Sequence, residues 1–166
     1  MNNINLRAWQ RQDAQQLAAI ANNKNVWNNL RDQLPHPYTV TDALQWIARC
    51  STQNPSVNFA IVHNNEIAGS IGCVVKEDVY RKSMEIGYFI AEKYWGKGIA
   101  TEGVRLMLPY MKQNFSIVRI YAEVFAHNKA SMKVLQKNGF YLEGIRRKAV
   151  IKNDILIDDY VWVKLL

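Results

Sequence analysis

The sequence predicts an α/β (α+β) protein with a mixed sheet, and three observations support this fold class. Short segments alternate apolar and polar residues as strands do, and others space apolar residues three and four apart as helices do. The two kinds of segment are interleaved along the chain in the order strand, two helices, three strands, helix, strand, helix and final strands. No linker, repeat or low-complexity tract divides the 166 residues, so we expect a single domain over residues 1–166.

The first part of the chain is predicted to contain one strand and two helices. Residues 4–7 alternate apolar and polar, and Asp13 can cap a helix whose apolar residues lie on one side. Residues 34–38 include two prolines and should form an extended loop. Thr39 and Asp42 have the spacing of a capping box, so a second helix is expected to start there.

Three strands are expected next. Residues 59–63 and 67–76 flank the polar segment 64–66, which has the composition of a hairpin turn. Residues 84–90 follow a polar break and form the third predicted strand.

The last part should contain two helices and three strands. One helix starts at about Gly98, and Pro109 inside it predicts a kink or an early end. A strand is expected over residues 119–124, and Asn128 can cap a short helix. Two strands around residues 153–154 would close the chain as a hairpin.

Composition excludes several classes of protein. With 49% apolar and 21% charged residues the chain is not disordered, and no apolar run is long enough for a transmembrane helix. The two cysteines, Cys50 and Cys73, form no CxxC pair, so we expect a reducing, cytoplasmic location and no metal site built from them. A net charge of +7 is compatible with nucleic acid, an acidic protein or a phosphate-rich cofactor.

The most informative segment joins the strand that ends at Ile90 to the helix that starts near Gly98. Gly96 and Gly98 allow the backbone to direct several N–H groups to one point, where the helix dipole is also positive. Such a loop can bind phosphate through the backbone. It matches neither the Walker loop nor GxGxxG, and an ordinary tight turn would explain the glycines equally well.

Several motifs together resemble the GNAT superfamily of acetyl-CoA-dependent N-acetyltransferases, and most closely its ribosomal-protein N-terminal alanine and serine acetyltransferases. The matching segments are Glu85–Tyr88 (EIGY), Tyr94–Glu102 (YWGKGIATE), Asn128–Phe140 (NKASMKVLQKNGF), Leu34–Thr39 (LPHPYT) and Phe140–Gly144 (FYLEG). The resemblance covers nearly the whole chain. It implies a GNAT-like, mostly antiparallel twisted sheet of about six or seven strands flanked by about four helices.

The resemblance also implies acetyl-CoA as co-substrate and no metal. The family's phosphate signature, Gln/Arg-x-x-Gly-x-Gly/Ala, maps onto residues 95–100, with Trp95 where Gln or Arg is usual. Backbone amides would hold the pyrophosphate, while Phe89, Ile90 and Asn128 would bind the pantetheine arm. Lys133 or Lys137 could lie near the adenosine phosphate, or could simply be solvated. The implied cofactor-binding residues are Phe89, Ile90, Trp95, Gly96, Lys97, Gly98, Ile99, Ala100, Thr101, Asn128 and Ser131.

Acetyl transfer needs a group that takes a proton from the acceptor amine. Glu85 is the first candidate, because it lies on the strand that leads into the glycine loop. It could instead orient the amine or form a salt bridge. Asp158 in the final hairpin is the second candidate and has a better chance of being structural.

The departing thiolate needs a proton donor. Many family members place a tyrosine where this chain has Leu135, so that acid is missing here. Ser131 resembles a serine of the ribosomal branch and could hydrogen-bond the sulfur, or it could be an ordinary first-turn residue. Cys73 lies in an apolar strand and is not expected to be a nucleophile, so direct transfer in a ternary complex is preferred.

The acceptor is predicted to be a primary amine, first of all a protein N-terminus of the ribosomal-protein type. A polyamine, an amino acid or an aminoglycoside is the alternative. The first two helices, the 34–38 loop with His36 and Tyr38, and the final hairpin should form the acceptor surface. We expect a monomer or homodimer that binds no membrane.

Two remote alternatives are a non-catalytic CoA-binding protein and an RNA-binding module. The charge and the basic run Arg146–Lys148 favour the latter, but no RNP-like segment surrounds Tyr88 and Phe89, so no nucleic acid is expected.

Overall fold

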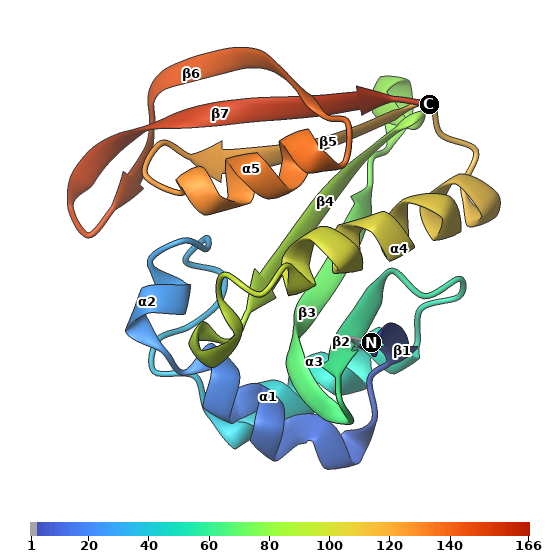
Figure 1. Cartoon of the computed structure of the whole chain (residues 1–166), viewed down its shortest axis with the longest axis vertical. Coiled ribbons are helices and arrows are strands. Elements are labelled where there is room, and N and C mark those ends of the chain that lie inside the picture. Colours follow the sequence, from blue (N-terminus) through green and yellow to red (C-terminus); the bar gives the residue numbers. More distant parts are fainter. Residues whose placement is uncertain (1–2) are drawn as a thin grey trace. The chain divides into compact units, whose positions relative to one another are not determined.

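The computed structural model of this protein describes residues 3–166, and its strands follow the hydrogen-bonded order β1-β2-β3-β4-β5-β7-β6 (Figure 1). The pairs β1–β2, β2–β3, β5–β7 and β6–β7 are antiparallel and β4–β5 is parallel. This is the mixed, mostly antiparallel sheet expected from the sequence.

The elements have the following bounds in the described residues. The strands are β1 (Ile4–Ala8), β2 (Asn58–His63), β3 (Glu66–Val75), β4 (Ser83–Ile90), β5 (Arg119–Phe125), β6 (Tyr141–Lys152) and β7 (Ile155–Leu165). The α-helices are α1 (Ala14–Ala21), α2 (Lys24–Trp27), α3 (Val40–Ser51), α4 (Ile99–Asn114) and α5 (Lys129–Lys137). Three 3-10 turns are η1 (Arg11–Asp13), η2 (Asp78–Tyr80) and η3 (Glu92–Tyr94). The residues group into two compact units: the first runs up to Gly72 and adds Tyr88–Met107, and the second combines Cys73–Gly87 with Leu108–Leu166.

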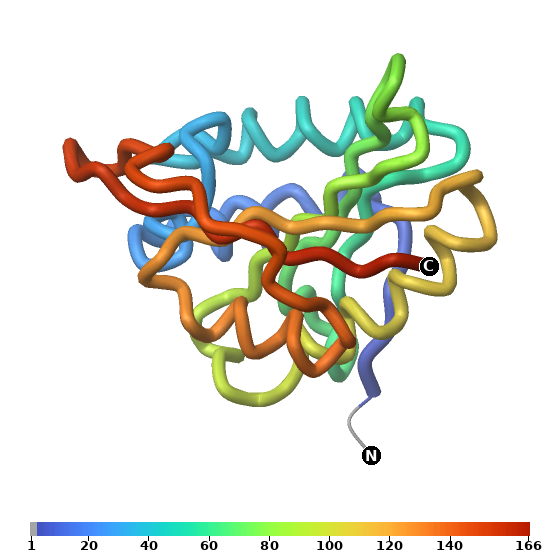
Figure 2. Tube along the Cα trace, turned by 90° about the horizontal axis from the view of Figure 1, so that it is seen from above, coloured from blue at the N-terminus to red at the C-terminus, as the bar shows by residue number. Residues whose placement is uncertain are grey.

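In the first unit, helices lie on both faces of the strands. Ala60 and Val62 of β2 belong to the apolar core that α1 and α3 cover. Ile61 points to the other face, where it contacts α4: a Cβ atom built on Gly103 would lie 3.0 Å from Cδ1 of Ile61. Figure 2 shows α3 and the start of α4 on opposite sides of these strands.

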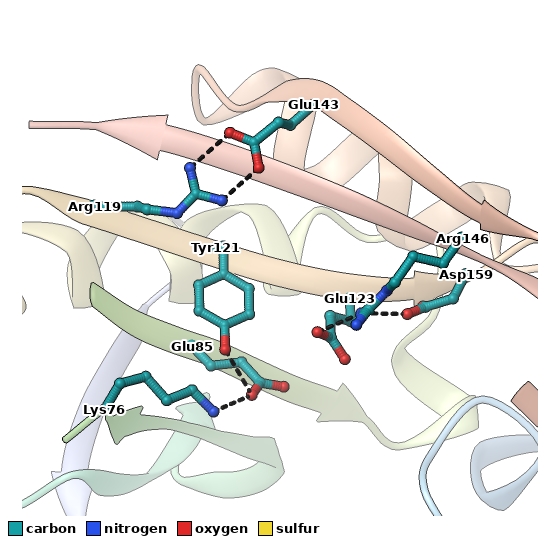
Figure 3. Close-up of polar contacts among 8 residues, drawn as sticks. All are labelled: Lys76, Glu85, Arg119, Tyr121, Glu123, Glu143, Arg146 and Asp159. Carbon is teal, nitrogen blue, oxygen red and sulfur yellow. Dashed lines mark hydrogen bonds and ion pairs between the residues drawn. The ribbon is translucent and has the colours of Figure 1, made fainter. Parts of the chain in front are cut away.

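In the second unit, α5 covers one face of the strands. Lys164 of β7 donates a hydrogen bond to the carbonyl of Asn138 at the end of α5, and the Lys129 ammonium lies over the Tyr160 ring. Met132 and Leu135 of α5 are buried. The opposite face of these strands carries polar side chains from β4, β5, β6 and β7 (Figure 3).

Two of the three capping predictions are confirmed, those at Thr39 and Asn128. The third is wrong: Asp13 precedes α1, but its side chain caps no amide of this helix, because the carboxylate accepts from Arg7 and from the Gln10 amide instead. Thr39 and Asp42 form the expected box at α3, with Oγ1 of Thr39 accepting from the Asp42 amide at 3.2 Å.

The short helix α2 was not predicted, because four residues show no periodicity, although Asn23 caps it. α4 runs through Pro109 to Asn114, so the early end does not occur. Burial of Met107 and Met111 outweighs the loss of one backbone hydrogen bond.

Candidate active site

The glycine loop in the first unit has the geometry expected for a backbone anion site. Gly96 and Gly98 have φ values of +75° and +77°, which glycine adopts without strain. The left-handed φ is what favours glycine at both positions. A Cβ atom built on either residue would meet nothing within 4 Å, so the space beside the loop is open. α4 starts at Ile99 immediately after the loop.

The amides of this loop have no backbone acceptor in the described part of the chain. Within residues 3–166, the N–H groups of residues 96–100 donate no hydrogen bond to a backbone carbonyl, and the Glu102 amide of α4 donates to the Gly98 carbonyl at 3.1 Å. N–H groups at a helix start carry partial positive charge and bind anions. The loop therefore fits a phosphate or pyrophosphate group, and the Lys97 ammonium, 5.2 Å from the centre of the Tyr94 ring, adds a cation beside it.

The turn before the loop is held by specific hydrogen bonds. The indole N–H of Trp95 donates to the Ile90 carbonyl at 2.8 Å, which closes the segment from β4 to the loop. Trp95 remains 46% exposed although its N–H is used internally. On the other side, Glu66 accepts from the Lys93 ammonium at 2.7 Å and the Tyr94 hydroxyl at 2.5 Å.

The end of β4 approaches β3 closely. A Cβ atom on Gly69 would lie 2.2 Å from the Phe89 carbonyl oxygen, so only glycine fits there. The Ala91 amide donates to the Ala68 carbonyl at 2.8 Å. The Phe89 side chain packs partly buried against the core under α1 and α3, and Ile90 is buried. Both residues thus have fixed positions at the start of the glycine loop.

In the second unit, Glu85 lies within a small hydrogen-bonded group on the polar face. Its carboxylate accepts from the Lys76 ammonium at 2.9 Å and from the Tyr121 hydroxyl at 3.5 Å (Figure 3). The Glu85 side chain is only 12% exposed. Partial burial alone would lower the pKa of Lys76, but hydrogen bonds to Glu85 and Tyr121 outweigh it and the pKa is raised. Lys76 is therefore charged at neutral pH, and the salt bridge that was the alternative role of Glu85 is present.

The parallel pairing beside Glu85 is short. β4 and β5 are in register from Ser83–Arg119 to Glu85–Tyr121, whereas β4 continues to Ile90 and β5 to Phe125. The pairing therefore ends at the residue that we predicted as the base.

Two further charge groups lie on the same face of the second unit. Arg119 makes a two-pronged contact with Glu143 at 2.6 and 2.5 Å, and Arg146 contacts both Glu123 and Asp159 (Figure 3). Asp159 is 3% exposed. Sequence reasoning missed these contacts and those of Lys76 and Tyr121. Their only signal was the alternation of polar and apolar residues along each strand, which does not reveal partners.

Asn128 and Ser131 lie together at the start of α5. Oδ1 of Asn128 accepts from the Ser131 amide at 3.1 Å, so the expected cap is formed. Capping uses the Asn128 oxygen, and its Nδ2 is the group that would donate to a ligand. Lys133 and Lys137 lie on α5 with exposed side chains.

Several other candidates have structural surroundings. Asp158 accepts from the Lys148 amide at 2.8 Å and the Arg147 guanidinium at 2.6 Å, and these contacts lower its pKa. A carboxylate held this way is a poor base, which favours a structural role. Tyr38 is buried in the core of the first unit, and burial raises its pKa to about 12. His36 is exposed beside the Trp27 ring, with the ring centres 5.5 Å apart.

The cysteines have the properties of inert core thiols. Both are buried, and burial raises the pKa of Cys73 to about 12 and that of Cys50 to about 11. Over residues 3–166, no group of three His, Cys, Asp or Glu side chains could hold a metal ion. None of the helices in this range is long and apolar enough to cross a membrane.

Comparison with known proteins identifies the family. Residues 3–141 match the acetyltransferase (GNAT) domain, and the chain belongs to this family of acetyltransferases. A segment of 94 residues, 55% of this chain and 52% of the relative, is 42% identical to the Bacillus subtilis (strain 168) protein named "Probable N-acetyltransferase YjcK". The matched segment thus spans about half the length of that relative.

Two of the relatives have names that give substrates of different kinds. The ribosomal-protein-serine acetyltransferase of Escherichia coli (strain K12) is 28% identical over 65% of this chain and 60% of its own. The spermidine N(1)-acetyltransferase of the same organism is 26% identical over 86% of this chain and 75% of its own. Among solved structures, RimL, a ribosomal alpha-N-protein acetyltransferase in complex with coenzyme A, superposes with a TM-score of 0.86 at 21% identity, covering 98% of this chain and 94% of RimL. This similarity shows a shared fold.

Proposed function

We propose that this protein moves the acetyl group of acetyl-CoA to a primary amine by direct transfer in a ternary complex. The observation that carries the proposal is the open glycine loop, whose amides at residues 96–100 donate to no backbone carbonyl in the described chain. Family membership and the coenzyme A in the RimL structure support the choice of cofactor.

In this proposal the cofactor binds mainly through backbone groups. The amides from Gly96 to Thr101 hold the pyrophosphate, and the Lys97 ammonium adds charge. Because these contacts need no polar side chain at position 95, Trp95 can replace the usual Gln or Arg and fasten the loop to Ile90 instead. The backbone of Phe89 and Ile90 and Nδ2 of Asn128 bind the pantetheine arm.

The proposed chemistry assigns the removal of the amine proton to Glu85 and a hydrogen bond to the leaving sulfur to Ser131. The amine nitrogen attacks the thioester carbonyl carbon, and Glu85, directly or through a water, takes the proton that the nitrogen loses. The C–S bond then breaks and the sulfur leaves as a thiolate, to which the Ser131 hydroxyl donates a hydrogen bond. The thiolate takes its proton from solvent water, and the proton held by Glu85 is returned to solvent. The buried thiols of Cys50 and Cys73 are unsuited to forming an acyl-enzyme, which supports direct transfer.

The proposed acceptor is a protein N-terminus, with a small amine as the second candidate. The ribosomal-protein-serine acetyltransferase among the relatives supports the first, and the spermidine acetyltransferase supports the second. We further propose that the protein is cytoplasmic and acts as a monomer or homodimer.

A panel of acceptors tests the proposal. The protein with acetyl-CoA is offered peptides with free N-terminal Ala or Ser, the same peptides N-terminally blocked, spermidine, free amino acids and an aminoglycoside, and CoA release is measured. We expect turnover with free but not blocked peptides. Turnover with spermidine alone would establish the second candidate, and absence of acetyl-CoA binding in calorimetry would reject the proposal.

A further inference from the structure

A single carboxylate in the first unit joins the turn before the glycine loop to helix α2. Glu92 of η3 accepts a hydrogen bond from Nδ2 of Asn23 at 2.7 Å and another from Nδ2 of Asn25 at 2.8 Å. These two contacts lower the pKa of Glu92, so it is ionised at neutral pH. The turn that leads into the proposed pyrophosphate site is thus tied to a segment far away in the sequence.

The side-chain oxygen of Asn23 caps the N-terminus of α2. This atom, Oδ1, accepts from the amides of Asn25 at 2.8 Å and Val26 at 3.1 Å, while Nδ2 is held by Glu92. A helix of four residues is too short to be stable alone, so α2 depends on its cap and on tertiary contacts. The contact with Glu92 keeps the Asn23 amide in the orientation that caps this helix.

α2 in turn contacts the loop that we assign to the acceptor surface. The indole N–H of Trp27 donates to the Leu34 carbonyl at 2.9 Å, and the Trp27 ring lies beside His36. The other end of the loop is held by Asn22, whose Oδ1 accepts from the Tyr38 amide at 3.0 Å. Hydrogen bonds together with short stretches of backbone therefore link the glycine loop to residues 34–38 within one unit.

We infer that Glu92 is a positioning residue that couples CoA binding at the glycine loop to the conformation of α2 and the 34–38 loop. The inference rests on the proposed function, because it requires that CoA bind at residues 96–101. A bound pyrophosphate restrains the loop and the η3 turn just before it. Glu92 then presents a fixed carboxylate to Asn23 and Asn25, which favours the capped form of α2.

Coupling of this kind has a reciprocal consequence. An acceptor that binds the ordered 34–38 loop should bind better when CoA is present, and CoA should bind better when the acceptor is present. Couplings between two sites are typically about 5- to 150-fold in affinity. The inferred coupling acts on recognition of the acceptor, and in this inference Glu92 contacts neither the acceptor nor CoA.

Hydrogen–deuterium exchange with CoA as the probe tests the inference without knowledge of the acceptor. In the unaltered protein, CoA is expected to slow amide exchange about tenfold at residues 96–101 and about fivefold at residues 23–38. In Glu92→Ala the first effect should remain and the second should disappear. Asn25→Ala, which removes one of the two side-chain donors to Glu92, should reduce the second effect in the same direction.

Glu66→Ala is the matched control, because Glu66 of β3 is a carboxylate that contacts the same turn, but through Lys93 and Tyr94 rather than through α2. It should leave the CoA effect at residues 23–38 in place. The double variant Glu92→Ala/Asn25→Ala should lose no more than Glu92→Ala, since both act through one contact.

The outcomes separate the inference from the proposed function. Slowing at residues 96–101 alone in the unaltered protein would overturn the coupling while CoA binding stands. Persistence of the effect at residues 23–38 in Glu92→Ala would also overturn it. No slowing at residues 96–101 would reject CoA binding there, and the coupling with it.

Discussion

The glycine loop and the polar face of the second unit present their polar groups by opposite means. The loop presents backbone amides at consecutive positions, and its shape follows from two left-handed glycines two residues apart. The polar face assembles side chains from separate strands, as with Glu85, Lys76 and Tyr121. In the proposed function, the cofactor is bound through backbone groups, whereas the proposed base, Glu85, has side-chain neighbours that can adjust its affinity for a proton.

The largest effect is expected for Glu85→Gln, which keeps the shape of the side chain but cannot take a proton. If Glu85 is the base, kcat/KM should fall about 100-fold while the dissociation constant of CoA stays the same. Steady-state kinetics and calorimetry measure the two quantities.

Glu143→Gln is the control, because it removes an exposed partner of Arg119 on the same face and should change kcat/KM less than about twofold. If Glu85→Gln also changes kcat/KM less than about threefold, the salt bridge with Lys76 is the role of Glu85, and the polar face has no part in proton transfer.

Gly98→Val tests whether CoA binding depends on the backbone conformation of the glycine loop. A left-handed conformation costs a residue with a Cβ atom about 2 kcal/mol, so the loop should relax and the dissociation constant of CoA should rise about 30-fold. Gly144→Val is matched, since a Cβ atom there also meets nothing within 4 Å and its φ is not left-handed. Equal CoA affinity in the two variants would contradict a backbone-based site.

Ser131→Ala should lower kcat about fivefold, with little change in the KM for acetyl-CoA, if the hydroxyl hydrogen-bonds the leaving sulfur. Ser131→Thr keeps a hydroxyl and should recover most of the rate. A full rate in Ser131→Ala would show that Ser131 serves only as the first-turn residue whose amide Asn128 caps.

Lys76→Met should have the smallest effect at the optimum pH, less than about twofold, but should alter the pH profile. The raised pKa of Lys76 means that its charge opposes protonation of Glu85 throughout the neutral range. Without this cation the partly buried carboxylate binds a proton more readily, so the acidic limb of kcat/KM should move about one unit to higher pH. If the acidic limb of kcat/KM is unchanged in Lys76→Met, the group whose protonation controls the rate is not Glu85.

Much of the fold could be predicted from the sequence because the signals are local. The Thr39 capping box, the hairpin turn after His63 and the helix after Gly98 depend on residues within a few positions of one another. α2 was missed because its stability comes from Glu92, 69 residues from Asn23, and from the loop that Trp27 contacts. The position of Pro109 inside a helix could be predicted, but the continuation of α4 beyond it could not. That continuation depends on burial, which is a property of the packed core.

The candidate site shows the same difference between local and tertiary information. The sequence by itself determined the glycine loop, because a positive φ at Gly96 and Gly98 and the helix that follows are consequences of residue type and order. Only the tertiary structure decided which charges meet. Lys76 reaches Glu85 across nine residues, Tyr121 across 36 and Asn23 reaches Glu92 across 69. Those contacts depend on strand register and helix packing, which no short stretch of sequence specifies.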